Sequence, residues 1–371
     1  MDNVELLKSY FRNEKVSFTG DVSEEIKKMN EQSLAGYLYY VYGQPFYKVY
    51  LGLNLIQEKY FHIQKEITNL FNMNNIDHMY IKGSVLANLY PDSALRSRGD
   101  IDLIVRKEDF DKANKLLLDN EFNSIDINCY HHNEYIKNDL MIELHRDLLE
   151  KNDILHYYFD DIFRYKEIVE NNLYKLNNEI HYIYCVYHLN KHLINGEGLR
   201  YLLDFYYMHQ KWNLDYNFIS EELKKIGLYN LFENINQAIF IITNQEMPFM
   251  GTKGQLLIDY MNERGIHNQI ALGNEPNLDD AIYTRYVLSK DSKFKFLLNR
   301  LLLRNKKERE NLYPRLSKYK LLYPLLLIYR FFSLAKRHFI RSFKLLFSKK
   351  DKYNKIINMY SEMGVISTEK K

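Results

Sequence analysis

The chain is poor in cysteine, proline and glycine. Its 371 residues include 2 Cys, 6 Pro and 14 Gly. The two cysteines, Cys129 and Cys185, are too few for a disulfide framework or a Cys-rich zinc site. We therefore expect a reducing, cytoplasmic setting, and the scarcity of helix-breaking residues predicts long helices.

The sequence also lacks a long uninterrupted apolar run. The first ten residues carry acidic side chains and no apolar core, so no signal peptide is expected. The most apolar stretch begins at Leu321 and is interrupted by Pro324, Arg330 and Lys336. Since a membrane-spanning helix needs about 20 apolar residues, no transmembrane span is predicted.

The net charge is only +3, but the basic residues are unevenly distributed. Residues 300–349 contain 14 Lys or Arg and 2 acidic residues, interleaved with Phe and Leu. This composition fits three alternatives for the segment. It could be an amphipathic helix packed on the rest of the chain, a helix on an anionic membrane surface, or a segment that binds nucleic acid. The second would make the protein peripheral at the inner membrane face.

Hydrophobic spacing divides the chain into four regions. Residues 1–75 are expected to be helical, residues 76–150 to form an α/β core, residues 151–299 to form a helical domain, and residues 300–371 to form a basic, apolar helical tail. An irregular linker is expected over 251–280. The expected fold class is α+β, with a small mixed sheet between helical N-terminal and C-terminal flanks. Within the core, the predicted strands are 78–82, 100–106, 122–136 and 139–145, and the predicted helices are 84–90 and 108–120.

The most informative motif is Asp100-Ile101-Asp102, at the start of an apolar strand-like run. Because strand side chains alternate, both carboxylates point to one face, with α-carbons about 6.6–6.8 Å apart. The two carboxylates of such a pair repel each other and lose solvation, and bound cations compensate both costs. Paired Mg²⁺ ions commonly catalyse attack at phosphorus. Asp100 and Asp102 are therefore candidate metal ligands, and Glu143, in a later strand-like run, is the candidate third.

A lone Asp-x-Asp also occurs at solvated strand ends, but a second motif lies upstream. Gly83-Ser84 follows a strand-like run and precedes a helical one, which predicts a turn whose backbone N–H groups bind an anion. The Ser84 hydroxyl can donate to a phosphate oxygen. Lys82, Arg96 and Arg98 are cations that either bind phosphate or neutralise the acidic cluster.

This constellation resembles the nucleotidyltransferase superfamily that includes DNA polymerase β. It is most similar to a bacterial group of uncharacterised nucleotidyltransferases. The 15-residue separation between Ser84 and Asp100 exceeds the superfamily norm but is shared by that group. The resemblance covers most of residues 75–210 and rests on Lys82-Gly83, Tyr90-Pro91, Arg96, Gly99 to Val105, Glu143-Leu144-His145, His188, Lys191-His192, Leu199-Arg200 and Asp204.

The resemblance implies transfer of an NMP from an NTP to an acceptor, with release of pyrophosphate. The triphosphate would lie over Gly83-Ser84, and Mg²⁺ or Mn²⁺ would be held by Asp100, Asp102 and Glu143, the last alternatively acting as a base. The acceptor is left open: a small molecule, a sugar, a protein or an RNA end. The alternative function is a non-catalytic nucleotide- or metal-binding module that docks on a membrane or protein partner through its basic tail.

Further polar residues are expected to line the far wall of the cleft. His188 and His192 are four apart on a predicted helix, a spacing that suits one metal, but no third ligand at metal spacing is evident. Asp204 is expected to orient Arg200 one helical turn away, whereas His131-His132 is explained adequately as polar surface. The residues predicted for the wall, contacting nucleotide or acceptor, are His145, His188, Lys191, His192 and Arg200.

Overall fold

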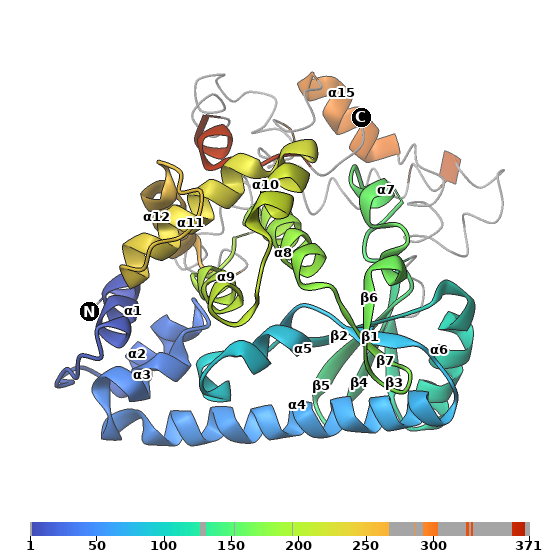
Figure 1. Cartoon of the computed structure of the whole chain (residues 1–371), viewed down its shortest axis with the longest axis horizontal. Coiled ribbons are helices and arrows are strands. Elements are labelled where there is room, and N and C mark those ends of the chain that lie inside the picture. The colour runs from blue at the N-terminus through green and yellow to red at the C-terminus, as the bar shows by residue number, and fades with distance from the viewer. Residues whose placement is uncertain are drawn as a thin grey trace.

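A seven-stranded mixed sheet with helices packed on both faces forms the centre of the protein (Figure 1). This confirms the predicted α+β class. The computed structural model describes residues 2–126, 131–151, 153–194, 196–266, 286, 292–302, 324–325, 328 and 358–367.

The helices before and within the core are α1 Asn3–Phe11, α2 Val22–Asn30, α3 Ala35–Tyr42, α4 Tyr47–Met73, α5 Gly83–Leu86 and α6 Phe110–Asp119. Those that follow are α7 His156–Phe159, α8 Asn178–Leu193, α9 Arg200–Lys211, α10 Tyr216–Lys225, α11 Tyr229–Thr243, α12 Gly254–Arg264 and α15 Lys293–Leu302. Short 3-10 turns connect several of them, at 44–46, 87–89, 93–95, 107–109 and 162–165.

The strands occur in the spatial order β3-β4-β5-β2-β1-β7-β6. The central strand β2 pairs antiparallel with β1 and parallel with β5, so the ends of β2 and β5 that carry acidic residues lie side by side. The bounds are β1 His78–Tyr80, β2 Asp100–Val105, β3 Asn123–Asp126, β4 His132–Lys137, β5 Leu140–His145, β6 Lys166–Glu170 and β7 Leu173–Leu176.

Side-chain alternation in β2 separates the two faces of the sheet. Ile101, Leu103 and Val105 are buried in one apolar cluster with α4 and α6. Ile104 belongs to a second cluster with α8 and α9, on the face toward which Asp100 and Asp102 also point. The period of two therefore directs the acidic pair into the space between the sheet and α8.

Helix α4 supports the opposite face over its C-terminal half. It has 27 residues, a length of about 40 Å at 1.5 Å per residue. Figure 1 shows it along the lower side of the molecule, beneath the sheet at one end and beside α3 at the other. Its buried residues Tyr60, Ile63, Ile67 and Phe71 face the sheet.

The structure differs from the sequence predictions at two places after residue 150. Strands β6 and β7 lie in the stretch expected to be helical, and β7 pairs parallel with β1. Four of the five residues of β6 are exposed at the sheet edge, so its apolar residues show no buried face from which a strand could be recognised. Helix α12 occupies part of the predicted linker 251–280.

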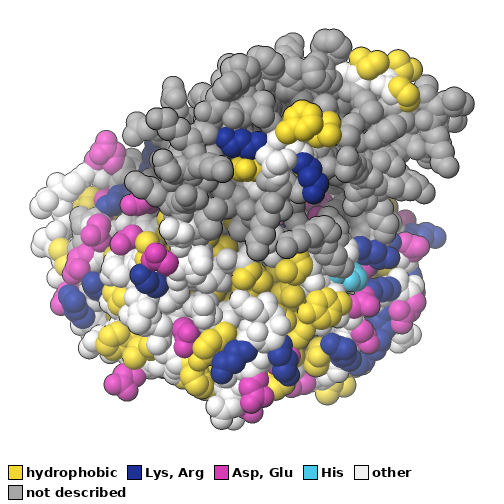
Figure 2. All heavy atoms as spheres, turned by 90° about the horizontal axis from the view of Figure 1, so that it is seen from above, with side chains coloured by type: hydrophobic (Ala, Val, Ile, Leu, Met, Phe, Trp, Pro, Cys, Tyr) yellow, Lys and Arg dark blue, Asp and Glu magenta, His cyan; other side chains and the backbone are white. Residues whose placement is uncertain are grey.

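Most of the basic segment 300–349 lies outside the described residues, so its three alternative structures stay predictions. In the described part of the chain, no helix combines the length and apolarity needed to cross a membrane. Seen from above, the described surface shows acidic and basic side chains interspersed with scattered apolar ones (Figure 2). No large patch of a single charge is visible on the described part of this face.

Candidate functional site

The strand register places the polar residues of three strands on one face of the sheet. Asp102 of β2 is opposite Glu143 of β5, which is opposite Glu134 of β4. One row further along, His145 of β5 is opposite His132 of β4. Because opposite residues in a sheet share a face, the carboxylates and imidazoles form one continuous polar surface.

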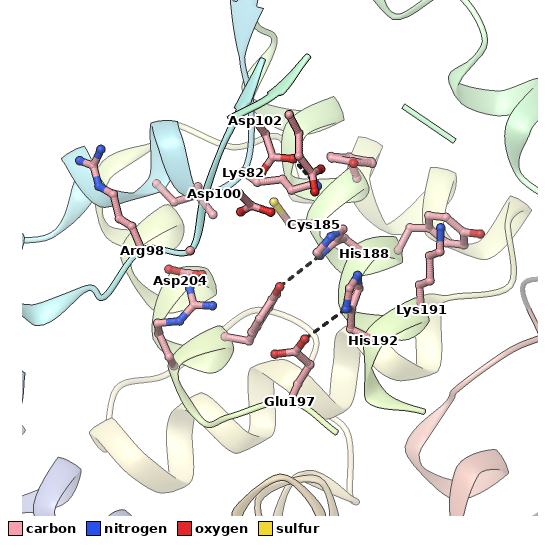
Figure 3. A pocket seen from close by; sticks show the side chains of 18 of the residues that line it. Lys82, Arg98, Asp100, Asp102, Cys185, His188, Lys191, His192, Glu197 and Asp204 are labelled. Atoms are coloured by element: carbon pink, nitrogen blue, oxygen red, sulfur yellow. Dashed lines mark hydrogen bonds and ion pairs between the residues drawn. The ribbon is translucent and has the colours of Figure 1, made fainter. Parts of the chain in front are cut away.

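A cavity of about 460 Å³ lies over this surface, a volume within the range of about 300–1,000 Å³ typical of small-molecule sites. Asp100, Asp102, Glu143 and His145 line it from the sheet, and Lys82 and Gly83 from the start of α5. The opposite wall comes from α8 and α9 (Figure 3). The cavity therefore brings together most of the predicted site residues.

Lys82 connects the turn to the acidic pair. Its backbone has φ +49°, and its N–H donates to Nε2 of His181, 3.1 Å away. Burial lowers the pKa of His181 to about 4, so the neutral ring accepts this bond. The Nζ of Lys82 lies 2.6 Å from Oδ1 of Asp102. Burial alone would lower the pKa of Lys82, but the charges of Asp102, Asp100 and Glu143 together raise it.

The three carboxylates have different electrostatic environments. The charge of Asp102 and burial raise the pKa of Asp100 to about 6. For Asp102, burial is outweighed by Lys82 and His145, which lower its pKa. Burial alone would raise the pKa of Glu143, but the hydrogen bond from His145 and the nearby charge of Lys82 together lower it. The cluster thus has one carboxyl that protonates readily and two that stay ionised.

His145 lies between two of these carboxylates. Its Nε2 is 3.1 Å from Oδ1 of Asp102 and 3.1 Å from Oε2 of Glu143, and the residue is 2% exposed. The expectation that His145 shares a face with Glu143 agrees with this position. Its other nitrogen, Nδ1, is buried and has no hydrogen-bond partner among the described residues.

These residues fit a divalent cation. One ligand atom from each of Asp102, Glu143 and His145 lies within 4.8 Å of the others, and Asp100 lines the same cavity. Carboxylate oxygens are the ligands that Mg²⁺ and Mn²⁺ prefer, and the imidazole is compatible with the softer of these ions.

Arg96, predicted to bind phosphate, is held by Asp204 instead. Its Nε and Nη2 donate to the two carboxylate oxygens at 2.7 and 2.9 Å. Arg200 and Tyr90 donate to the same carboxylate at 3.0 and 2.7 Å, which confirms that Asp204 orients Arg200. Arg96 still lines the cavity next to Gly83, where an added Cβ would lie 3.0 Å from Nη1.

Two other predicted phosphate ligands, Arg98 and Ser84, are not directed at the cavity in the way that the prediction requires. Arg98 lines the cavity, but its guanidinium points away from Asp100 and toward α4, where Nη1 donates to Gln64 at 3.0 Å (Figure 3). Burial lowers the pKa of Arg98 to about 10. The hydroxyl of Ser84 is buried without a partner among the described residues and does not line the cavity. Their roles in phosphate binding stay predictions.

The wall formed by α8 and α9 contains four of the five residues predicted for it, whereas the fifth, His145, lies on β5 at the opposite side of the cavity. The rings of His188 and His192 stack with centroids 4.2 Å apart. His192 pairs with Glu197 at 3.3 Å, and His188 is 3.2 Å from the hydroxyl of Tyr201 (Figure 3). Burial and the neighbouring His192 lower the pKa of His188. Lys191 and Arg200 complete this polar wall.

Several residues of the cavity were not predicted from the sequence. His131 and His132 line it, although they were interpreted as polar surface. An available signal was the spacing of His132 and Glu134, which share a strand face with period two. The remaining wall residues gave no such signal, because only the packing of α8, α9 and the segment between them on the sheet brings them to the site; these are Tyr184, Cys185, Glu197 and Tyr201.

Comparison with known proteins gives one match. A family model described as uncharacterised nucleotidyltransferase matches residues 50–238, just over half of the chain. The matched segment includes β2, β5 and α8, and thus the acidic residues and both walls of the cavity. No curated protein and no solved structure matches the chain.

Proposed function

Because the chain belongs to the family of uncharacterised nucleotidyltransferases, we propose that it transfers an NMP from an NTP to an acceptor and releases pyrophosphate. The observation that carries this proposal is the strand register. It sets Asp102 beside Glu143 on the cavity floor, with Asp100 lining the same cavity. Two carboxylate-bearing strands beside a cationic turn form the arrangement that phosphoryl chemistry requires.

Asp100, Asp102 and Glu143 would hold Mg²⁺ or Mn²⁺. A bound divalent ion supplies Lewis-acid stabilisation of charge on the phosphate oxygens. The raised pKa of Asp100 means that this carboxyl is ionised mainly above pH 6, so metal binding is favoured at neutral pH. Lys82 balances the charge of Asp102 and can turn toward a phosphate when a cation takes its place beside that carboxylate.

In the transfer, an acceptor oxygen forms a bond to the α-phosphorus while the bond from that phosphorus to the bridging oxygen breaks. Pyrophosphate leaves with the electron pair. Glu143, whose lowered pKa keeps it ionised, takes the acceptor proton or assists in cation binding. Gly83 allows the backbone before α5 to approach the triphosphate closely.

The wall of α8 and α9 provides the acceptor side of the cavity. His188, Lys191, His192 and Arg200 offer both neutral and cationic hydrogen-bonding groups there. This mixture suits a polar acceptor with hydroxyl or phosphate groups. The class of acceptor, whether small molecule, sugar, protein or RNA end, is to be found by labelling with the preferred nucleotide.

The deciding experiment is calorimetric titration of the full chain with each NTP, with and without Mg²⁺. We expect saturable binding that requires the metal and is lost in the Asp100→Ala/Asp102→Ala variant. The matched control, Asp111→Ala/Asp119→Ala, removes two exposed carboxylates of α6 and should bind as the parent does. Absence of binding for every NTP would overturn the proposal.

A turnover measurement complements the titration. With a cell extract as the source of acceptor and a labelled NTP as donor, Asp102→Ala should abolish labelling while the far-ultraviolet circular dichroism remains that of the folded parent. Near-parental labelling by the Asp102→Ala protein would exclude this mechanism.

A further inference from the structure

A second group of possible metal ligands lies beside the catalytic carboxylates. One nitrogen from each of His131, His132 and His145 lies within 4.8 Å of the others. The ring centroids of His131 and His132 are 6.0 and 5.1 Å from that of His145. His131 and His132 also line the cavity, so an ion can reach them from solvent.

The hydrogen bonds of two of these histidines match the pattern of metal-bound imidazoles. A ligating histidine usually donates its second N–H to a carboxylate, which fixes the tautomer. His145 has Nε2 beside Asp102 and Glu143, and His132 has Nε2 3.2 Å from Oε1 of Glu134. With the protons on Nε2, each ring presents Nδ1 as the unprotonated, ligating nitrogen.

Both Nδ1 atoms are in positions that fit this assignment. The Nδ1 of His132 is 2.8 Å from Nε2 of His131. Two nitrogens on one tetrahedral zinc ion, with Zn–N bonds of about 2.0–2.1 Å, would be about 3.3 Å apart, so a small ring movement is enough. The Nδ1 of His145 is buried and has no hydrogen-bond partner among the described residues, which is costly unless a ligand occupies it.

We propose that His131, His132 and His145 form a transition-metal site of the Zn²⁺ class, distinct from the carboxylate site for Mg²⁺ or Mn²⁺. Imidazole nitrogens suit Zn²⁺ and its neighbours, whereas Mg²⁺ takes oxygen ligands and holds its water tightly. Three protein ligands leave a fourth position for water or a substrate oxygen. The bound ion would add positive charge beside Glu143, at the edge of the cavity.

The inference goes beyond the proposed function and does not depend on it. The test is titration of the full-length, untagged protein with Co²⁺ in excess Mg²⁺, followed by visible absorption, with displacement by Zn²⁺. We expect one equivalent of Co²⁺ to give a tetrahedral spectrum. His131→Gln and His132→Gln should each weaken binding at least about tenfold, because each removes a ligand.

Two control variants separate this site from others. His62→Gln removes an exposed histidine of α4 and should bind Co²⁺ as the parent does. Asp100→Asn should lose metal-dependent NTP binding but keep the Co²⁺ spectrum. Asp100 is not a proposed Co²⁺ ligand, and the carboxylates beside His145 and His132 belong to other residues. Circular dichroism of each variant verifies folding.

Two results would overturn the inference. One is absence of Co²⁺ binding in excess Mg²⁺. The other is binding that His131→Gln and His132→Gln leave unchanged, which would place the ion elsewhere. Either result leaves the proposed nucleotidyl transfer intact, because that proposal is tested by NTP titration.

Discussion

The Nζ of Lys82 lies 2.6 Å from Oδ1 of Asp102, and their side chains are 18% and 1% exposed. The two residues come from different segments: Lys82 precedes α5 and Asp102 is in the middle of β2. Removal of either partner of such a buried pair leaves an uncompensated charge. The pair therefore links the stability of the segment around Lys82 to the charge of Asp102 on β2.

Lys82→Met should destabilise the metal-free protein by about 3 kcal/mol, because Asp102 is left buried without its cation. Urea denaturation in the presence of a chelator measures the change. The double variant Lys82→Met/Asp102→Asn should recover much of the loss. Lys175→Met is the matched control: its pair with Glu167 is 45% exposed on both sides, and it should cost less than about 1 kcal/mol. If the double variant instead lost as much free energy of unfolding as the two single variants combined, the coupling between Lys82 and Asp102 would be contradicted.

The raised pKa of Asp100 predicts a pH-dependent stability difference. The folded chain keeps this proton up to about pH 6, whereas the unfolded chain loses it near 3.8, so the Asp100 contribution to stability falls as pH rises between these values. At about 1.4 kcal/mol per pKa unit, the free energy of unfolding of Asp100→Asn should rise by about 2.4 kcal/mol relative to that of the parent between pH 4 and pH 7. Chemical denaturation of both proteins without metal measures this difference; a pH-independent difference would show that Asp100 is not perturbed.

The buried network around Asp204 should be essential to folding. Burial is outweighed by Arg96 and Arg200, which lower the pKa of Asp204, so Asp204→Asn leaves two guanidinium groups poorly compensated. We expect a loss of about 3 kcal/mol or more in urea denaturation. Lys253→Met, which breaks a pair about half exposed, is the control and should change stability by less than about 1 kcal/mol. Equal effects of the two variants would refute the assignment of a structural role.

Two helical glycines predict opposite effects of the same substitution. A Cβ at Gly36 in α3 would lie 2.0 Å from the carbonyl oxygen of Ala94, so Gly36→Ala should destabilise by about 1–3 kcal/mol or more. A Cβ at Gly52 in α4 meets nothing within 4 Å, so Gly52→Ala should stabilise by about 0.5–1 kcal/mol. Thermal unfolding of both variants checks the prediction. A similar shift in Tm for both variants would contradict the prediction, because it would mean that α3 can move away from the segment before β2.

Local patterns in the sequence predicted a large part of the core. The alternation through Asp100-Ile101-Asp102 gave both the strand and the shared face of its carboxylates, because period two follows from strand geometry alone. The apolar spacing within 108–120 gave the helix α6, which covers the other face. Strand β6 was not predicted because an exposed edge strand has no buried face to create a pattern. Strand β7 has only four residues, of which Leu176 alone is buried, so it is too short to show an alternation.

Tertiary structure alone decided the partners of the charged residues. Nothing local distinguishes Arg96 from Arg98, yet packing of α9 against the segment before β2 gives Arg96 the carboxylate of Asp204. Arg98 turns instead toward α4. Ion pairs between residues about 100 positions apart depend on which elements pack together, and sequence spacing does not encode that.

The sequence by itself determined the type of chemistry: an acidic pair on one strand, a later Glu143, and a Gly-Ser turn before a helix. These features are local, and their geometry follows from backbone periodicity. Only the tertiary structure decided that β5 lies parallel beside β2 and so brings Glu143 and His145 next to Asp102. It also decided that α8 closes the cavity, because strand pairing and helix packing are set by burial summed over the whole core.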